Sequence, residues 1–300
     1  MVRLFKKESG GTITCQACSH FCHIEPGRRG LCGVRKNEQG KLKLLVDNQV
    51  LGLSVDPIEK KPLYHFLPGS QVFSFGTFGC NFSCQFCQNA FMSQSPKLKK
   101  YQPIVALKKL IAQYSQLLKP AEIIAAAQRN NCPAIAYTYN EPTVFVEYAY
   151  QIMKLARQNG LKNIWVTNGY QSKECFHLIK DYLDAANIDL KSMREEFYQR
   201  ICGAHLKPVL ENIKRFYQAG IWLELTTLVI PGQNDSVEEL MAIAAFIADI
   251  SPDIPWHVSA FHPIYKMKNV PITPLEKLKE AREIGQKAGL KHIHLGNISF

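Results

Sequence analysis

The sequence predicts an α/β fold, and three observations lead to that prediction. The chain has 300 residues, of which 46% are hydrophobic, so it has ample apolar surface for a buried core, and intrinsic disorder is excluded as its main description. After about residue 70, short runs of β-branched and aromatic residues alternate with longer stretches of helical spacing. The first 68 residues lack this alternation and hold four of the ten cysteines.

The alternation predicts parallel strands joined by helices. The runs expected to form strands are 71–77, 134–139, 163–167, 185–190, 222–230, 256–261 and 292–295. One intervening helix has clear end signals, since Pro142 is placed to open it and Gly160 to close it, and another is expected to begin near Ser236. Such units favour a partial (β/α)6 TIM-like barrel, in which chemistry lies on the loops after the strands' carboxyl ends. A doubly wound open sheet is the alternative.

The chain is expected to divide into a small Cys-rich, metal-binding N-terminal domain, residues 1–68, and a barrel, residues 69–300. Prolines and a glycine in 56–62 and 67–69 are typical of a connector between the two. A domain of this size has little hydrophobic core of its own, so a bound metal is expected to stabilise it.

Charge and hydropathy restrict the environment and the partners. No apolar run approaches the ~20 residues that span a bilayer, and no secretory signal is visible, which predicts a cytoplasmic protein without membrane contacts. The net charge of +11 would suit nucleic acid, but no nucleic-acid-binding module is recognisable, so no such partner is expected. In a reducing compartment, clustered cysteines favour metal binding over disulfides.

Three cysteines follow the 71–77 run directly, with the spacing C-x3-C-x2-C: Cys80, Cys84 and Cys87. They are therefore expected on the first loop at the catalytic edge of the barrel. A cubane iron–sulfur cluster takes four ligands, so three thiolates leave one iron open to a molecule that is not protein. The alternative is a structural zinc site completed by a distant histidine.

This triplet, with Phe86 before its last cysteine, resembles the signature of radical S-adenosylmethionine (SAM) enzymes. The resemblance implies a [4Fe–4S] cluster whose open iron binds SAM. It also implies that one electron cleaves the sulfonium bond of SAM and that a 5′-deoxyadenosyl radical abstracts hydrogen from a substrate.

Later strand ends are similar to SAM-binding segments of the same enzymes, in particular of the pyruvate formate-lyase activating enzymes. This similarity implies that SAM is held by residues of three successive strand ends, namely Asn140, Glu141, Thr167, Asn168, Asp189 and Lys191. His262, at the end of a further strand, is a candidate catalytic residue.

A second cysteine group stands in the N-terminal segment and consists of Cys15, Cys18, Cys22 and Cys32. Four thiolates close a metal site, which favours a structural zinc or an auxiliary, electron-relaying iron–sulfur cluster over a second SAM site. The spacing leaves zinc and iron open. The scattered Cys132, Cys175 and Cys202 are expected to be packing residues.

Taken together, residues 15–35, 56–66 and 136–142 and the triplet resemble the AmmeMemoRadiSam-system radical SAM enzymes, which are relatives of the pyruvate formate-lyase activating enzymes. The resemblance implies Memo-like and AMMECR-like partner proteins. A glycyl-radical-enzyme activase is the alternative function, and a non-catalytic, metal-stapled binding module is the alternative of another class.

One long segment also has an unusual charge pattern. Residues 60–121 contain eight lysines and no Asp or Glu. A positive face near the cysteine triplet would attract an acidic electron donor such as a flavodoxin or a ferredoxin.

Overall fold

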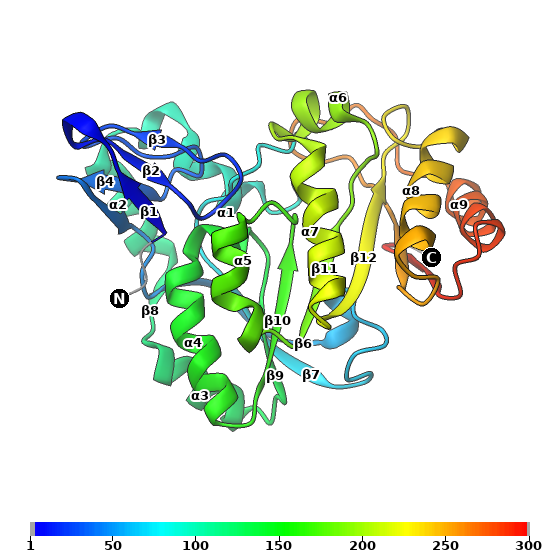
Figure 1. Ribbon diagram of the computed structural model, residues 1–300, viewed down its shortest axis with the longest axis horizontal. Coiled ribbons are helices and arrows are strands. Elements are labelled where there is room, and N and C mark those ends of the chain that lie inside the picture. The colour runs from blue at the N-terminus through cyan, green and yellow to red at the C-terminus, as the bar shows by residue number, and fades with distance from the viewer. Residues whose placement is uncertain (1–3, 299–300) are drawn as a thin grey trace.

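The computed structural model describes residues 4–298, in which a large sheet is covered by helices and a smaller cysteine-rich segment packs at one end (Figure 1). The sheet has nine strands in the order β14-β13-β12-β11-β10-β9-β7-β6-β8. Seven neighbouring strands are parallel: β7 (Gln71–Gly76), β9 (Ala134–Tyr137), β10 (Lys162–Thr167), β11 (Ala185–Asp189), β12 (Trp222–Val229), β13 (Trp256–Ala260) and β14 (Ile293–Gly296).

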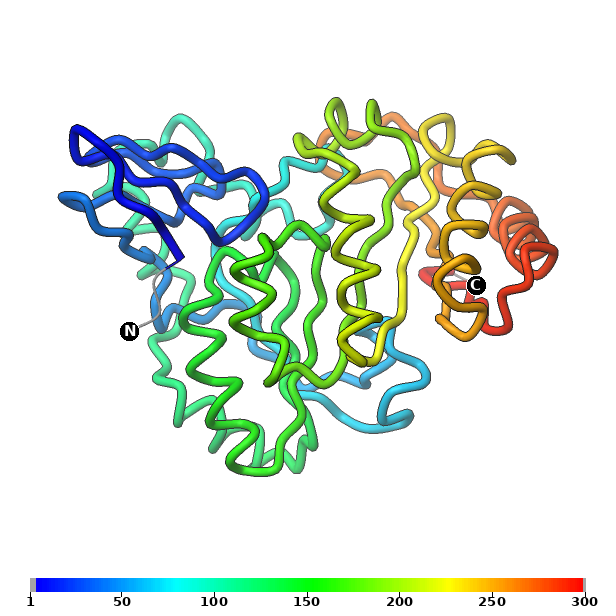
Figure 2. Tube along the Cα trace, in the orientation of Figure 1, coloured from blue at the N-terminus to red at the C-terminus, as the bar shows by residue number. Residues whose placement is uncertain are grey.

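These seven strands are the seven runs expected from the sequence, so the α/β fold class is confirmed. The sheet does not close into a full barrel, because its two outer strands, β14 and β8, do not pair with each other within residues 4–298. Figure 2 traces the chain from the cysteine-rich segment, in blue, to the C-terminal helices on the opposite side of the molecule, in orange and red.

Helices follow the parallel strands and cover the outside of the sheet (Figure 1). They are α1 (Ala90–Gln94), α2 (Ile104–Tyr114), α3 (Pro120–Arg129), α4 (Val146–Gln158), α5 (Lys173–Ile179), α6 (Glu195–Phe197), α7 (Leu206–Gln218), α8 (Val237–Ile250) and α9 (Leu275–Lys287). The expected end signals act as predicted at two of them. Ser236 caps α8 by accepting a hydrogen bond from the Glu239 N–H, and Gly160 follows α4 with a φ of +72°.

Two antiparallel strands extend the sheet beyond the expected set. β6 (Gln49–Pro57) lies against β7, with Val55 opposite Phe73, and β8 (Gln116–Leu117) pairs with the start of β6. β6 precedes the boundary expected at residue 68, so the last part of the N-terminal segment belongs to the large sheet. The division of the chain at residue 68 stays a prediction.

The rest of the N-terminal segment forms two small sheets. One contains β1 (Phe5–Lys7), β2 (Ile13–Cys15) and β3 (His23–Ile24), and the other contains β4 (Arg35–Glu38) and β5 (Lys41–Leu44). Main-chain hydrogen bonds join this segment to the loop after β10, from Ser19 N–H to the Tyr170 carbonyl and from Ser172 N–H to the Ala17 carbonyl. The cysteine-rich segment is therefore fixed against the end of the parallel sheet.

The core lies on both faces of the parallel strands, as expected for strands covered by helices. All four residues of β9 are buried, and Trp165 and Trp256 are fully enclosed. Gly76 ends β7 where the chain passes close to the end of β9, since a Cβ there would lie 2.5 Å from the Thr138 carbonyl oxygen. In residues 4–298 no helix is both long enough and apolar enough to cross a membrane.

Candidate active site

A deep cavity opens where the parallel strands end. It holds about 1840 Å³ of unfilled space, part of it open to solvent. The residues predicted for the cluster and for SAM all line this cavity: Cys80, Cys84, Cys87, Asn140, Glu141, Thr167, Asn168, Asp189 and Lys191. Residues that are far apart in the sequence meet here because parallel strands present their carboxyl ends at one edge.

The cysteine triplet lies on the loop between β7 and α1. Cys80 and Cys84 are each 8% exposed, while Cys87 is half-buried. Burial raises the pKa of the Cys80 and Cys87 thiols, so both stay protonated at neutral pH unless a cation offsets the cost of the buried charge. Such thiols are suited to a metal centre that displaces their protons on binding.

Asn140, after β9, fastens this loop to the sheet. Its side-chain amide donates hydrogen bonds to the Gly79 carbonyl oxygen at 2.7 Å and to Thr77 Oγ1 at 3.2 Å, and its Oδ1 accepts one from the Thr77 N–H at 3.2 Å. The residue therefore positions the backbone immediately before Cys80.

Glu141 is a buried carboxylate, 1% exposed, that joins the ends of two strands. Its oxygens accept hydrogen bonds from Thr143, from Thr167 Oγ1 at 2.8 Å and from the Asn168 N–H at 2.8 Å. Burial raises the pKa of Glu141, while these hydrogen bonds favour the ionised form. A carboxylate arranged in this way offers negative charge at the wall of the cavity.

Asn168 connects the end of β10 to the cysteine loop. Its Nδ2 donates to Asn81 Oδ1 at 2.7 Å, and its Oδ1 accepts from the Tyr170 N–H at 3.1 Å. The following Gly169 has a φ of +73°, and a Cβ there would lie 2.8 Å from Ile188 Cγ2, so this turn requires glycine.

Asp189 and Lys191 form an ion pair at the end of β11, with Lys191 Nζ 2.9 Å from Asp189 Oδ2. Burial alone would lower the pKa of Lys191, but the charge of Asp189 raises it above its ordinary value, so the lysine is a fixed cation. Its ammonium group also lies 5.5 Å from the centre of the Phe86 ring, within the triplet.

The side chains in this cavity suit a cluster better than a single metal ion. Among residues 4–298, no three His, Cys, Asp or Glu side chains stand close enough together to hold one ion. In a cubane each thiolate binds a different iron, so the cysteine sulfurs stand farther apart than the ligands of one ion do. The three thiols of the triplet, of which Cys80 and Cys84 are buried, line an open cavity and suit such a cluster.

The structure places His262 outside this cavity. Its Nε2 lies 2.9 Å from the carbonyl oxygen of Asn297. His257, which precedes it on β13, lines the cavity instead. Its Nε2 lies 2.6 Å from Oε2 of Glu224, and both residues are buried. The alternation of strand residues was the available signal, since His257 and Ser259 point to the same side of β13.

Two further groups at the cavity were not predicted. Lys61 and Tyr139 both contact the Asp56 carboxylate at 2.8 Å and both line the cavity. Cys202, which the sequence suggested as a packing residue, lies against Cys84, and this contact is the first cause of the raised pKa of the Cys84 thiol. Neither group has a local sequence signal, because tertiary contacts alone bring these residues together.

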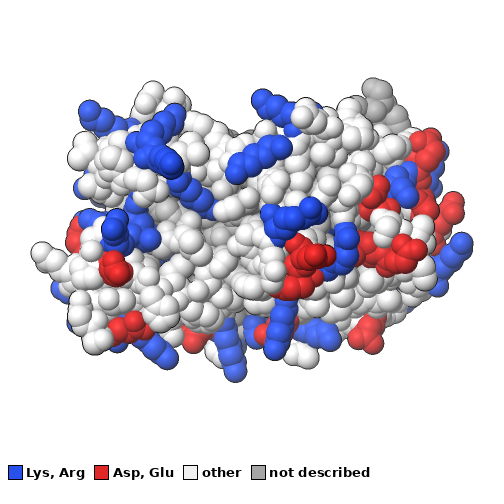
Figure 3. All heavy atoms as spheres, turned by 90° about the horizontal axis from the view of Figure 1, so that it is seen from above, with Lys and Arg blue, Asp and Glu red and all other residues white. Residues whose placement is uncertain are grey.

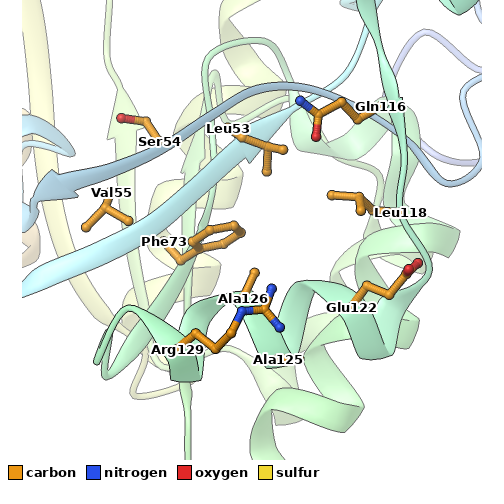
Figure 4. Close-up of a pocket in the computed structure, with 10 residues that line it drawn as sticks. All are labelled: Leu53, Ser54, Val55, Phe73, Gln116, Leu118, Glu122, Ala125, Ala126 and Arg129. Atoms are coloured by element: carbon orange, nitrogen blue, oxygen red, sulfur yellow. The ribbon is translucent and has the colours of Figure 1, made fainter.

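A second hollow lies outside this region, between the β6–β7 edge of the sheet and α3 (Figure 4). Its lining is largely apolar, with Leu53, Val55, Phe73 and Leu118 among its residues and Glu122 and Arg129 at its rim. It contains no cysteine or histidine, so it offers no ligands of the kind found in the main cavity.

Sequence comparison agrees with the site. Residues 75–244 match the Radical SAM superfamily, and the chain belongs to that superfamily. It is 41% identical over 295 residues to an uncharacterized protein of Methanocaldococcus jannaschii, which covers 98% of this chain and 84% of the relative.

More distant relatives include an activating enzyme. The 4-hydroxyphenylacetate decarboxylase activating enzyme of Clostridium scatologenes is 27% identical over 116 residues, 38% of this chain and 37% of that protein. Among solved structures, QueE from Escherichia coli superposes with a TM-score of 0.51 at 13% identity, over 83% of this chain and 94% of QueE, which shows a shared fold. The class of protein is therefore a radical SAM enzyme with distant similarity to glycyl-radical-enzyme activating enzymes.

Proposed function

We propose that this protein reductively cleaves SAM at a [4Fe–4S] cluster bound by Cys80, Cys84 and Cys87 and uses the resulting radical to abstract hydrogen from a substrate. The observation that carries the proposal is the position of three thiols, two of them buried, on one loop at a cavity that is also lined by polar strand ends. Three protein ligands leave one corner of a cubane for SAM.

When bound, the cluster and SAM supply the one-electron cleavage of the sulfonium bond. The residues of the chain orient the reactants. Lys191 and Asp189 carry opposite charges that suit the carboxylate and the ammonium or ribose groups of SAM, and Glu141 offers a further carboxylate. Thr167 and Asn168 hold Glu141 in place and complete this wall.

Asn140 and Asn168 have a second role in this proposal. Both amides hold the cysteine loop, through Gly79 and Asn81 respectively, so they fix where the open corner of the cluster faces. The site needs such support because a loop is less rigid than the strands that flank it. Closely packed aromatic rings, including Phe82 against Tyr170 at 5.1 Å, exclude water behind the loop.

Within this class, the proposed type is the AmmeMemoRadiSam system, with Memo-like and AMMECR-like proteins as partners. The support is the resemblance of the cysteine-rich segment and of the strand-end motifs, which cover nearly the whole chain. The second candidate is an activase of a glycyl-radical enzyme, which the similarity to the Clostridium scatologenes activating enzyme favours. A cytoplasmic location stays a prediction.

The test is anaerobic reconstitution of the full chain with iron and sulfide, followed by reduction and measurement of 5′-deoxyadenosine formed from SAM. The expected result is product formation that requires both reductant and cluster. If an intact, reduced cluster does not cleave SAM, the function that remains is the non-catalytic, metal-stapled binding module. Activation of a purified glycyl-radical enzyme, detected as a protein-based radical, would favour the second candidate.

A further inference from the structure

The four cysteines of the N-terminal segment enclose a space of their own. Cys15, Cys18, Cys22 and Cys32 all line it, together with Arg35 and with residues from the barrel. The space amounts to about 300 Å³ including a part open to solvent, with room near its centre for about one water-sized sphere. Within the part of the chain that the structure describes, no three His, Cys, Asp or Glu side chains stand close enough together to hold one ion, which suits a cluster better than a single zinc ion here as well.

A fixed positive charge borders this space. The guanidinium group of Arg35, 2% exposed, donates from Nε to Cys15 Sγ at 3.3 Å. Its two terminal nitrogens donate to the Glu147 carboxylate at 2.6 and 2.7 Å, which fixes the group in place.

A buried donor without a partner belongs to the wall of the same space. Asn81 is 2% exposed and lines the four-cysteine space, and its Nδ2 has no hydrogen-bond partner among residues 4–298. A buried amide N–H without an acceptor is costly, and such groups mark the place of an absent ligand. The sulfide or thiolate sulfurs of a cluster would be suitable acceptors.

Asn81 is also part of the cysteine triplet loop, so the two metal sites share a wall. The Nε2 of His20 lies 3.0 Å from the Asn81 carbonyl oxygen, one residue after Cys80. Gly79, one residue before Cys80, packs so closely on the N-terminal segment that a Cβ would lie 2.9 Å from the Cys32 carbonyl oxygen. The backbone of Cys32, in the four-cysteine site, thus packs directly against Gly79, which precedes Cys80 of the triplet.

The opposite side of the four-cysteine space lies near solvent. Leu31 lines the space and is 61% exposed, and Phe21, next to Cys22, is 40% exposed. Arg28 is exposed on the same segment. Seen along the strand ends, lysines and arginines are spread over this face of the molecule, while acidic groups gather toward the α8 and α9 side (Figure 3). An apolar contact within a basic surface suits an acidic redox protein.

We propose that Cys15, Cys18, Cys22 and Cys32 hold an iron–sulfur cluster, and that this cluster passes electrons from an acidic donor protein to the cluster at Cys80, Cys84 and Cys87. The relay rests on the proposed function, whereas the presence of the cluster does not. One electron moves from the reduced donor, a flavodoxin or a ferredoxin, to the four-cysteine cluster and then to the triplet cluster. The donor is oxidised by one electron, and no bond forms or breaks in either transfer.

The first experiment isolates the four-cysteine site. The triple variant Cys80→Ser, Cys84→Ser, Cys87→Ser is reconstituted anaerobically, and its iron, acid-labile sulfide and zinc are counted. The expected result is iron and sulfide in equal amounts, with an electron paramagnetic resonance signal after reduction that SAM does not change. A variant that binds zinc and no iron overturns the proposal and leaves the proposed function standing, because that function depends on the other three cysteines.

The second experiment tests the relay. In the double variant Cys18→Ser, Cys22→Ser, the triplet cluster should keep its SAM-dependent resonance signal after reduction by dithionite, a small reductant that reaches it directly. Its reduction by flavodoxin, followed by stopped-flow absorbance, should slow by an order of magnitude or more. An unchanged rate with flavodoxin overturns the relay.

A surface variant keeps the relay testable if the double variant does not fold. Leu31→Glu places a negative charge beside the four-cysteine site without removing a ligand. Reduction by flavodoxin should slow, and the loss should be greater at low than at high ionic strength. Met241→Glu, at a residue of α8 that is 55% exposed, is the matched control and should not change the rate. Equal rates for both variants overturn the proposed entry point.

Discussion

The two cysteine groups of this protein lie side by side but have opposite designs. The triplet borders a cavity of about 1840 Å³ that opens at the strand ends, whereas the four N-terminal cysteines surround a space of about 300 Å³. In the proposed function the first group leaves a coordination position for SAM, whereas four thiolates would close the second site. Burial does not distinguish the two groups, because both contain buried cysteines. They differ in the number of thiols and in the volume of the space beside them, and these features distinguish an open metal site from a closed one.

The largest expected effect comes from removing one ligand of the open centre. In Cys84→Ala the triplet cluster loses a third of its protein ligands, so SAM cleavage should fall to the background, measured as 5′-deoxyadenosine per chain. Cys132→Ala is the matched control, because Cys132 is buried but lines neither cysteine site. A Cys84→Ala variant that still cleaves SAM would remove the distinction between the two groups.

The closed centre should show its importance in stability. Arg35→Met leaves the partly buried Glu147 carboxylate without its cation, which should lower the free energy of unfolding by about 3–5 kcal/mol. Denaturant unfolding measures the change. Lys162→Met breaks the more exposed pair with Asp184 and should cost about 0–1 kcal/mol, so it serves as the control. Equal losses would show that Arg35 has no special role beside Cys15.

A smaller loss is expected when the tether of the open centre is removed. Asn140→Ala deletes the hydrogen bonds to Thr77 and Gly79 and should destabilise the protein by about 1–3 kcal/mol. It should also lower the amount of iron bound at the triplet. In the triple variant that lacks Cys80, Cys84 and Cys87, the same substitution should leave the amount of bound iron unchanged. Iron analysis of both backgrounds separates the two sites. A loss of iron in both would contradict a local effect.

A histidine packed against residues that line the cavity should make stability depend on pH. Burial, together with the neighbouring His257, His65 and His292, lowers the pKa of His294 to about 4, although the Glu224 carboxylate opposes the shift. The unfolded chain therefore binds more protons than the folded chain, so this contribution is complete above about pH 6.5 and is lost as the pH falls toward 4.

Replacing this histidine removes the titrating group. His294→Gln should flatten the fall in the free energy of unfolding between about pH 6.5 and pH 4, measured by denaturant unfolding at several pH values. His23→Gln, at an exposed histidine of the N-terminal segment, should leave the slope as it is. The same slope of the free energy of unfolding against pH in both variants would show that His294 does not cause the pH dependence.

The smallest effect is expected on the surface between the two sites. Lys99 and Lys100 are exposed and lie in the acid-free segment near the triplet loop. Charge reversal at both should slow reduction by an acidic donor in a salt-dependent way, since exposed charges act mainly on association. Lys97 is left intact because its ammonium group binds the Phe82 carbonyl of the cysteine loop. Rates that do not change at low salt would contradict this part of the electrostatic picture.

Local patterns were sufficient for the strands and for the ligand candidates. The seven parallel strands could be predicted because each is a short, largely apolar run between helical stretches, and all but β14 are mostly buried. The triplet could be found because its spacing lies within one loop. β6 was missed, because only two of its nine residues are buried and it joins the sheet from the N-terminal segment. Cys202 was missed as a neighbour of the site because nothing near it in sequence indicates what it contacts, whereas His257 could have been found from the alternation along β13.

The sequence by itself determined that this chain is a radical SAM protein with two cysteine groups and a set of polar strand ends, because these features depend on residue type and short spacing. Only the tertiary structure decided that the two groups share the wall formed by Gly79 and Asn81, and that one of them faces a large cavity and the other a small one. The physical reason is that parallel sheet packing brings distant loop residues to a single edge. Contacts made there depend on the whole fold and leave no pattern in any one segment.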